Sequence, residues 1–393
     1  MAIAKKIEEF LSKSSWIRKM FEEGAKLSSI HGRENVYDFS LGNPNVSPPN
    51  EFRQILSEIS LSSKKEDHCY MSNSGYLFVR ESVANYLSKE HEIAISEKEI
   101  IMTCGAAGAL NVILKTILDP GDEVIGLIPY FVEYGFYVDN HGGILKTVPT
   151  KEDFSIDIEA ISKSINQNTK AIIINSPNNP TGKIYSEENI LLLGNILEQK
   201  GKELNKTIYL ISDEPYRKIV YDGVKVPSIF KCYTESIIAN SYSKDLSIPG
   251  ERIGFIAVHP KSLLKDKLLD GMTLANRILG FVNAPAFMQR VIAKICGITV
   301  DVSEYTRKRD LICNILTDCG YEFVKPQGAF YVFPKTPIQD DVEFVKALQE
   351  ERILTVPGRG FGAPNHFRIA FCVDDKTITS SASGFDKIIK KYK

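Results

Sequence analysis

The sequence is poor in the features that mark secreted, membrane-spanning and nucleic-acid-binding proteins. Its 393 residues include seven cysteines, an odd number, and no Cys-x-x-Cys pair, so neither a disulfide framework nor a zinc pattern is visible. Lysine and arginine number 48 and aspartate and glutamate 49, and the formal net charge of -1 gives no general attraction for nucleic acid or anionic membranes. No apolar run approaches the ~20 residues of a membrane span, and acidic residues stand where a signal peptide needs an apolar stretch. We therefore expect a cytoplasmic protein that binds neither nucleic acid nor membrane nor metal.

What is present is the composition of an average globular protein. Hydrophobic residues make up 43% and charged residues 25%, which excludes a disordered or collagen-like chain. At roughly 150 residues per domain, the length predicts two or three domains. A chain of this length can bury a large hydrophobic core without disulfides or metals.

Apolar runs and helical patterns alternate between about residues 100 and 260. Runs typical of buried strands occur at 100–103, 123–127, 170–175, 208–213, 236–240 and 253–258. After about residue 284 a long helical stretch is followed by short strands. The pattern predicts an α/β fold, in which a large domain (46–299) holds a mostly parallel sheet covered by helices. A smaller α+β domain would comprise residues 300–393 and residues 1–45 with an N-terminal arm.

Polar residues follow these apolar runs and should gather at one edge of the sheet. They lie in the segments 103–108, 175–182, 213–216 and 241–244. In an open α/β sheet, ligands bind beyond the carboxyl ends of the strands. Glycine and alanine at 105–107 open a helix, which suits either a bound phosphate or an ordinary tight turn. Asp213 is either a helix N-cap or the partner of a buried cation.

Taken together, these residues meet the needs of pyridoxal 5′-phosphate (PLP). This cofactor requires a lysine for its Schiff base, an acid beside its ring nitrogen, donors to its phenolate oxygen, a phosphate site and a ring that stacks on it. A nucleotide is the alternative ligand on composition alone. Neither of the glycine-rich nucleotide motifs, Gly-x-x-x-x-Gly-Lys-[Ser/Thr] or Gly-x-Gly-x-x-Gly, follows a predicted strand, which counts against it.

The sequence resembles the class I/II aminotransferases of the aspartate aminotransferase fold, which is PLP fold type I. Residues 241–254, which place Lys244, Arg252 and Gly254 at fixed offsets, look like the lysine signature of that family. Further family motifs occur in order at 39–44, 129–131, 179–182, 213–216, 326–331, 357–358 and 367–369. The resemblance covers about residues 39–372, and it implies an enzyme that moves an amino group between an L-amino acid and a 2-oxo acid such as 2-oxoglutarate.

The resemblance assigns the catalytic roles to three residues. Lys244 would form the internal aldimine and later carry the proton between Cα and the cofactor. Asp213 would pair with the pyridinium nitrogen and keep the ring an electron sink. Tyr216 would donate a hydrogen bond to the phenolate oxygen, as would Asn179.

The same resemblance implies the remaining binding residues and a homodimer with shared active sites. Phosphate ligands would come from the helix start and from a hydroxyl and a cation: Gly105, Ala106, Ala107, Ser241 and Arg252. Tyr70 would reach the phosphate of the neighbouring subunit. Phe131 would stack on the ring where many members have tryptophan, since the single tryptophan of this chain is Trp16, and Tyr130 is the competing candidate. Arg368 would bind the substrate α-carboxylate, with Gly42 and Asn179 assisting.

The cofactor motifs leave the reaction and the substrate open. A carbon–sulfur lyase or decarboxylase on the same fold would share Lys244, Asp213 and Arg368. A regulator that keeps such a domain as a sensor would need a DNA-binding module, and the stretch before the first motif at residue 39 is too short for a winged helix. Aspartate-specific members read the distal carboxylate with a second arginine. Arg277 lies near that region of the sequence, although a surface position is the alternative for it.

Overall fold

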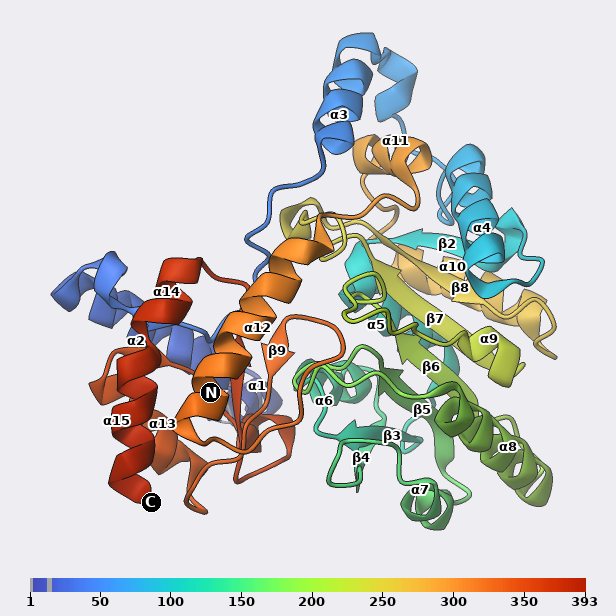
Figure 1. Ribbon diagram of the computed structural model, residues 1–393. Coiled ribbons are helices and arrows are strands. Elements are labelled where there is room, and N and C mark those ends of the chain that lie inside the picture. Colours follow the sequence, from blue (N-terminus) through green and yellow to red (C-terminus); the bar gives the residue numbers. More distant parts are fainter. Residues whose placement is uncertain (1–2, 13–15) are drawn as a thin grey trace.

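The computed structural model describes residues 3–12 and 16–393, and a seven-stranded sheet forms its centre (Figure 1). The strand order is β2–β8–β7–β6–β5–β3–β4. The strands are β2 (Ile100–Thr103), β3 (Glu123–Ile128), β4 (Ile144–Pro149), β5 (Thr169–Asn175), β6 (Tyr209–Asp213), β7 (Ser236–Ser241) and β8 (Gly254–Val258). Strand β8 is antiparallel to both of its neighbours, and the other neighbouring strands are parallel. This mostly parallel sheet confirms the predicted α/β fold class.

Helices cover both faces of the sheet, which explains why central strands such as β5 are almost continuously apolar, whereas the edge strand β4 is partly exposed and carries Lys146 and Thr147. Ile172 and Ile174 of β5 belong to the hydrophobic cluster on one face, whereas Ala171 and Ile173 belong to the cluster on the other. Successive side chains of a strand point to opposite faces, so each must be apolar when both faces are buried. One face is covered by α5 (Gly105–Ile117), α6 (Glu133–Asp139) and α10 (Lys265–Ile278). The other is covered by α3 (Asn50–Ser62), α4 (Leu77–His91), α7 (Ile158–Ser164), α8 (Glu187–Leu204), α9 (Ile229–Cys232) and α11 (Ala286–Ile295).

The C-terminal part of the chain lies beside the sheet (Figure 1). It forms most of a third hydrophobic cluster, separate from the two on the faces of the sheet. Its helices are α12 (Val302–Cys319), α13 (Asp341–Glu350), α14 (Asp375–Ser380) and α15 (Ala382–Tyr392). A three-stranded antiparallel sheet in the order β11 (Val356–Pro357), β12 (Phe367–Ala370), β9 (Tyr331–Val332) packs against them. Short 3-10 helices occur at Arg33–Asn35, Lys65–His68, Glu97–Glu99, Pro249–Glu251 and Gly358–Phe361.

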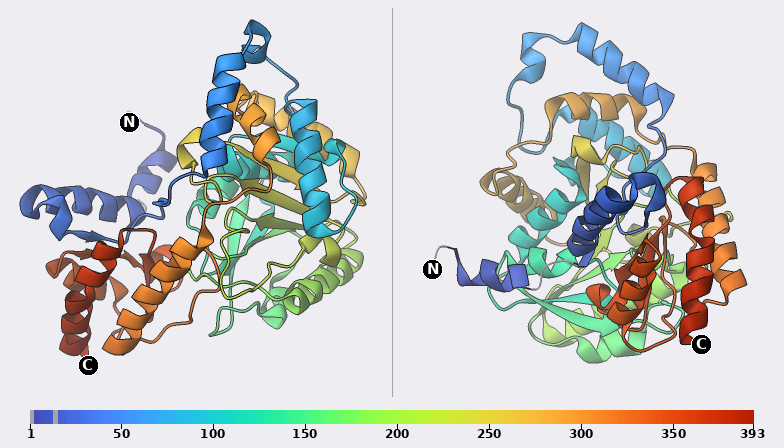
Figure 2. Two further views of the ribbon diagram at one scale, coloured as in Figure 1. Left: turned by 45° about the horizontal axis from the view of Figure 1, so that its top comes forward. Right: turned by 90° about the vertical axis from the view of Figure 1, so that its left-hand side faces the viewer.

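The N-terminal segment joins this C-terminal part. Strand β1 (Tyr37–Asp38) pairs in parallel with β10 (Ile353–Leu354), and Phe39 is fully buried in the same core. Helix α2 (Trp16–His31) packs beside it (Figure 2), whereas α1 (Lys5–Ser12) contacts α6, with Phe10 edge-on to Phe136 at 4.8 Å. These pairings are in line with a small domain made from both chain ends, and the borders at 45/46 and 299/300 stay predictions.

None of the helices in the described part of the chain is both long and apolar enough to cross a bilayer.

Candidate active site

A cavity of about 690 Å³ opens at the carboxyl ends of the parallel strands, between the large sheet and the C-terminal part. Most of the residues singled out from the sequence line it: Gly42, Ala106, Ala107, Phe131, Asn179, Asp213, Tyr216, Ser241, Lys244, Arg252 and Arg368. Asp213 and Ser241 are the last residues of β6 and β7, and Ala106 lies in the first turn of α5. The alternation of strands and helices thus delivers side chains far apart in the sequence to one place.

Lys244 lies in the cavity wall in the turn after β7. Its Nζ donates a hydrogen bond to the carbonyl oxygen of Gly42 at 2.8 Å. Burial lowers the pKa of Lys244 to about 8, and the charges of Arg368 and Arg252 act in the same direction. A larger fraction of the amine is therefore neutral near neutral pH than for an ordinary lysine, and the neutral form is the nucleophile.

Asp213 presents a carboxylate oxygen that no residue in the described part of the chain pairs. Its Oδ2 accepts a hydrogen bond from the Tyr134 hydroxyl at 2.6 Å, and Asn175 Nδ2 fixes the backbone by donating to its carbonyl oxygen. No described residue offers a hydrogen bond to Oδ1, although the atom is buried. Burial raises the pKa of Asp213 to about 7. An unpaired carboxylate oxygen in a cavity wall suits a protonated ring nitrogen.

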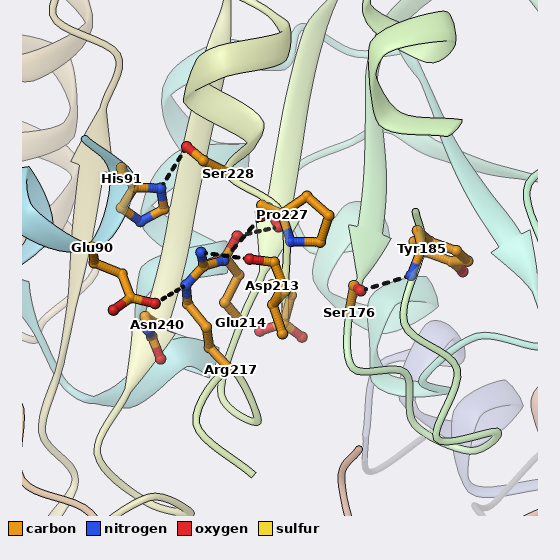
Figure 3. A network of polar contacts seen from close by, with 12 residues as sticks. Glu90, His91, Ser176, Tyr185, Asp213, Glu214, Arg217, Pro227, Ser228 and Asn240 are labelled. Atoms are coloured by element: carbon orange, nitrogen blue, oxygen red, sulfur yellow. Dashed lines mark hydrogen bonds and ion pairs between the residues drawn. The ribbon is translucent and has the colours of Figure 1, made fainter. Parts of the chain in front are cut away.

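The next residue of the chain, Glu214, belongs to a buried ion pair with Arg217 (Figure 3). Glu214 is 1% exposed and accepts hydrogen bonds from Ser212 Oγ at 2.7 Å and from Arg217 Nη1 at 3.2 Å. Arg217 also donates through Nε to Glu90 Oε1 at 3.2 Å. The cation therefore balances the second carboxylate, and Asp213 is the acid of this strand end that remains available to a ligand.

The start of helix α5 forms an anion site together with Arg252. Gly105 has φ +74°, and a Cβ on it would lie 2.7 Å from Nη2 of Arg252. Only glycine fits here, because the backbone is left-handed and the guanidinium approaches closely. Gly105 itself lies behind the cavity lining, whereas Ala106 and Ala107 present the first turn of the helix to the cavity. The unpaired N–H groups of a helix start and an adjacent cation bind phosphate.

Arg368 lies in the cavity wall and can bind a second anion besides the phosphate. It is 2% exposed and donates from Nη1 to Asn179 Oδ1 at 3.0 Å and from Nη2 to the Ser40 carbonyl oxygen at 2.5 Å. Its guanidinium lies 4.7 Å from the ring centre of Tyr331 and 4.9 Å from that of Phe361. Within the described part of the chain, Nε has no acceptor. A rigid, buried guanidinium with donors to spare suits a carboxylate.

The aromatic wall of the cavity comes from Phe131. Its ring packs edge-on against Tyr134 at 5.6 Å. Tyr130, the competing candidate, is absent from the lining and packs instead against Gly362, where a Cβ would lie 3.0 Å from its ring. The geometry therefore favours Phe131 as the residue that stacks on a ring bound in the cavity.

Two residues considered from the sequence lie away from the cavity. Tyr70 is 91% exposed and borders a separate hollow of about 230 Å³ beside Met71 and Phe281. Arg277 is exposed near the end of α10. A role for either in this chemistry requires another chain.

Sequence reasoning missed three tyrosines of this region. Tyr134, in the first turn of α6, contacts Asp213, and no local sequence signal marks it. Tyr331 lines the cavity and lies at the end of the 326–331 motif, to which we assigned no role. Glu133 and Tyr137 of α6 also line the cavity without having been predicted.

The mostly parallel sheet, with helices on both faces and a cavity at the carboxyl ends of its strands, is the arrangement of PLP fold type I, and the comparisons identify the family. The family model described as "Aminotransferase class I and II" matches residues 34–384, so the chain belongs to this family of PLP-dependent enzymes. It is therefore an enzyme that transfers amino groups, as predicted.

Individual relatives agree with this assignment. A probable aspartate aminotransferase of Methanocaldococcus jannaschii is 34% identical over 349 residues, which are 87% of this chain and 90% of the relative. The crystal structure of an amino transferase from Eubacterium rectale has a TM-score of 0.97 and 41% identity, covering 100% of this chain and 99% of that one. Aspartate aminotransferase from Thermus thermophilus with maleate has a TM-score of 0.86 at 25% identity, covering 99% of this chain and 100% of that one.

Proposed function

We propose that the cavity holds PLP bound covalently to Lys244, and that the enzyme moves amino groups between an L-amino acid and a 2-oxo acid such as 2-oxoglutarate. The observation that carries the proposal is the convergence of a lysine of lowered pKa, a buried carboxylate oxygen without a partner and a buried arginine in one cavity. When bound, PLP supplies an aldehyde and an electron-withdrawing ring that stabilises negative charge at the substrate Cα.

The residues of the chain hold and tune the cofactor. The N–H groups at the start of α5, with Ser241 and Arg252, bind the phosphate. The free oxygen of Asp213 accepts from the ring nitrogen and keeps it protonated, because an adjacent negative charge favours the cationic form. Tyr216 and Asn179 donate to the phenolate oxygen.

Other residues orient the substrate and move the proton. Arg368 pairs with both oxygens of the α-carboxylate and thereby fixes the direction of the Cα–H bond. The neutral amine of Lys244 would accept the proton from the substrate Cα and later give it back as a general acid. The Gly42 carbonyl holds this amine at the cavity wall.

A panel of amino acids with 2-oxoglutarate and pyruvate as acceptors tests the reaction and identifies the substrate. We expect the cofactor absorbance to change with the amino acid alone and to return when the oxo acid is added, and the new amino acid to form in equal amount. Release of ammonia and pyruvate from cystathionine would instead mark a carbon–sulfur lyase. The named relatives include aspartate, aspartate/prephenate and aromatic-amino-acid aminotransferases, so aspartate and the aromatic amino acids head the list of donors, and prephenate joins the acceptors.

We further propose a cytoplasmic homodimer in which Tyr70 completes the partner's phosphate site. The exposure of Tyr70 supports this, since a side chain that is 91% exposed is free to contact a second chain. Other apolar side chains exposed on nearby elements are Leu77, Phe78, Leu274 and Ile278. An exposed apolar surface of this kind favours an interface between chains.

Mixing two defective variants should restore activity. A hybrid of Tyr70→Ala and Lys244→Ala chains contains one site with both residues intact, so random assortment restores about a quarter of the wild-type sites. The measurement is the rate of amino transfer after the variants exchange subunits. As a control, Asp213→Ala mixed with Lys244→Ala stays inactive, because both residues serve the site of their own chain. A fully active monomer in analytical ultracentrifugation would contradict the shared site.

A further inference from the structure

Tyr331 contacts three parts of the candidate site at once. Its hydroxyl lies 2.8 Å from that of Tyr216, and its ring lies under the guanidinium of Arg368. A Cβ on Gly42 would lie 1.9 Å from the Tyr331 oxygen, so the hydroxyl packs directly on the backbone whose carbonyl holds Lys244. We propose that Tyr331 is a positioning residue that directs the Tyr216 proton toward the cofactor and fixes the plane of Arg368 for the substrate. The inference rests on the proposed function.

The hydroxyl pair has a defined direction once the cofactor is considered. A phenolate oxygen only accepts hydrogen bonds, so the Tyr216 hydroxyl must donate its single hydrogen bond to that oxygen. Tyr331 must then donate to Tyr216. Burial raises the pKa of both hydroxyls, so each stays protonated near neutral pH and has one proton to donate. Donation from Tyr331 polarises Tyr216 and strengthens the bond that Tyr216 makes in turn.

The ring of Tyr331 restrains the arginine. The guanidinium contacts the rings of both Tyr331 and Phe361, while Asn179 and the Ser40 carbonyl take two of its donors. These contacts leave Arg368 one orientation for a carboxylate. Removing one ring loses a cation–π contact and allows the guanidinium to rotate.

Tyr331→Phe tests the hydroxyl alone, because the ring remains. The readout is the pH titration of the absorbance of the cofactor bound to Lys244, without substrate. A weaker bond from Tyr216 leaves more negative charge on the phenolate oxygen, which holds the proton of the lysine link more firmly. We expect the titration midpoint to rise by about 0.2–0.6 pH units. Tyr331→Phe introduced into a Tyr216→Phe variant should not raise the titration midpoint further, because the Tyr216 hydroxyl through which Tyr331 acts is already absent.

Tyr331→Leu tests the ring. We expect KM to rise by about 2- to 30-fold for chemically different amino acids alike, whereas Tyr331→Phe leaves KM near the wild-type value. Tyr321→Phe is the matched control, since Tyr321 is also buried and donates one hydrogen bond, to the Phe385 carbonyl, away from the cavity. It should change neither the midpoint nor KM.

The possible results distinguish a failure of the proposed role of Tyr331 from a failure of the proposed PLP-dependent function. A wild-type protein without a PLP absorbance band would refute the proposed function. If the wild type shows a pH titration of its cofactor absorbance and Tyr331→Phe has the same midpoint, the role of the Tyr331 hydroxyl is overturned. An equal rise in the Tyr216→Phe background would also overturn it, because Tyr331 would then act by another route. An unchanged KM in Tyr331→Leu would overturn the role of the ring.

Discussion

Replacing Lys244 by alanine is expected to lower kcat by about 10⁴-fold or more while the protein still binds PLP. The variant loses the group that attacks the aldehyde and the base that moves the Cα proton, and general acid–base catalysis alone contributes up to about 10⁴-fold. The phosphate site at α5, the Asp213 carboxylate and the Phe131 wall remain, so noncovalent binding persists. The measurement is the single-turnover rate with an amino acid, together with the cofactor content after dialysis.

Borohydride reduction identifies the lysine independently of activity. Reduction of the wild type should fix the cofactor on the peptide containing Lys244, and reduction of Lys244→Ala should fix none. Lys183→Ala is a suitable control, because Lys183 is partly buried, pairs with Asp153 at 2.9 Å and lies outside the cavity lining. A label on any other lysine would show that the assignment is wrong.

Replacing Arg368 by lysine should lower kcat/KM by roughly thirty-fold to several-thousand-fold for every amino acid alike. The loss of a buried charge-assisted pair costs on the order of 2–5 kcal/mol. Lysine offers a point charge without the planar pair of donors that Arg368 presents between two rings. Cofactor binding should change little, because the phosphate and ring contacts lie elsewhere. The measurement is kcat/KM for two chemically different amino acids, with the cofactor spectrum as control.

Arg359→Lys provides the comparison at a surface position. Arg359 pairs with Asp340 and Asp341 and is absent from the cavity lining, so its replacement should leave kcat/KM close to wild type. A loss confined to one amino acid in Arg368→Lys would make Arg368 a reader of the side chain. The absence of any loss would remove it from the site.

The sequence predicted the parts of the molecule whose signal is local. The six predicted strands of the large sheet have mostly apolar runs because both of their faces are buried, and the residues around Lys244 form one contiguous motif. Strand β4 was not predicted, because it lies at the edge of the sheet, is partly exposed and carries Lys146 and Thr147. Tyr134 and Tyr331 escaped prediction because their roles depend on partners 79 and 115 residues away, Asp213 and Tyr216. Such contacts arise from the topology of the sheet and from the packing of the C-terminal part against it, and the local sequence does not specify them. Tyr70 stays a prediction because its expected partner is a second chain.

The contacts of Arg368 join three segments that are far apart in the chain. β12 supplies the arginine, the loop after β5 supplies Asn179, and the segment after β1 supplies the Ser40 carbonyl. A carboxylate bound here therefore bridges parts of the protein with separate hydrophobic clusters. A ligand that binds only when these three segments lie together must stabilise that arrangement relative to arrangements in which they lie apart. Amide hydrogen exchange in these three segments should slow together when a simple carboxylate ligand is added, and protease cleavage between residues 39 and 46 should slow with it.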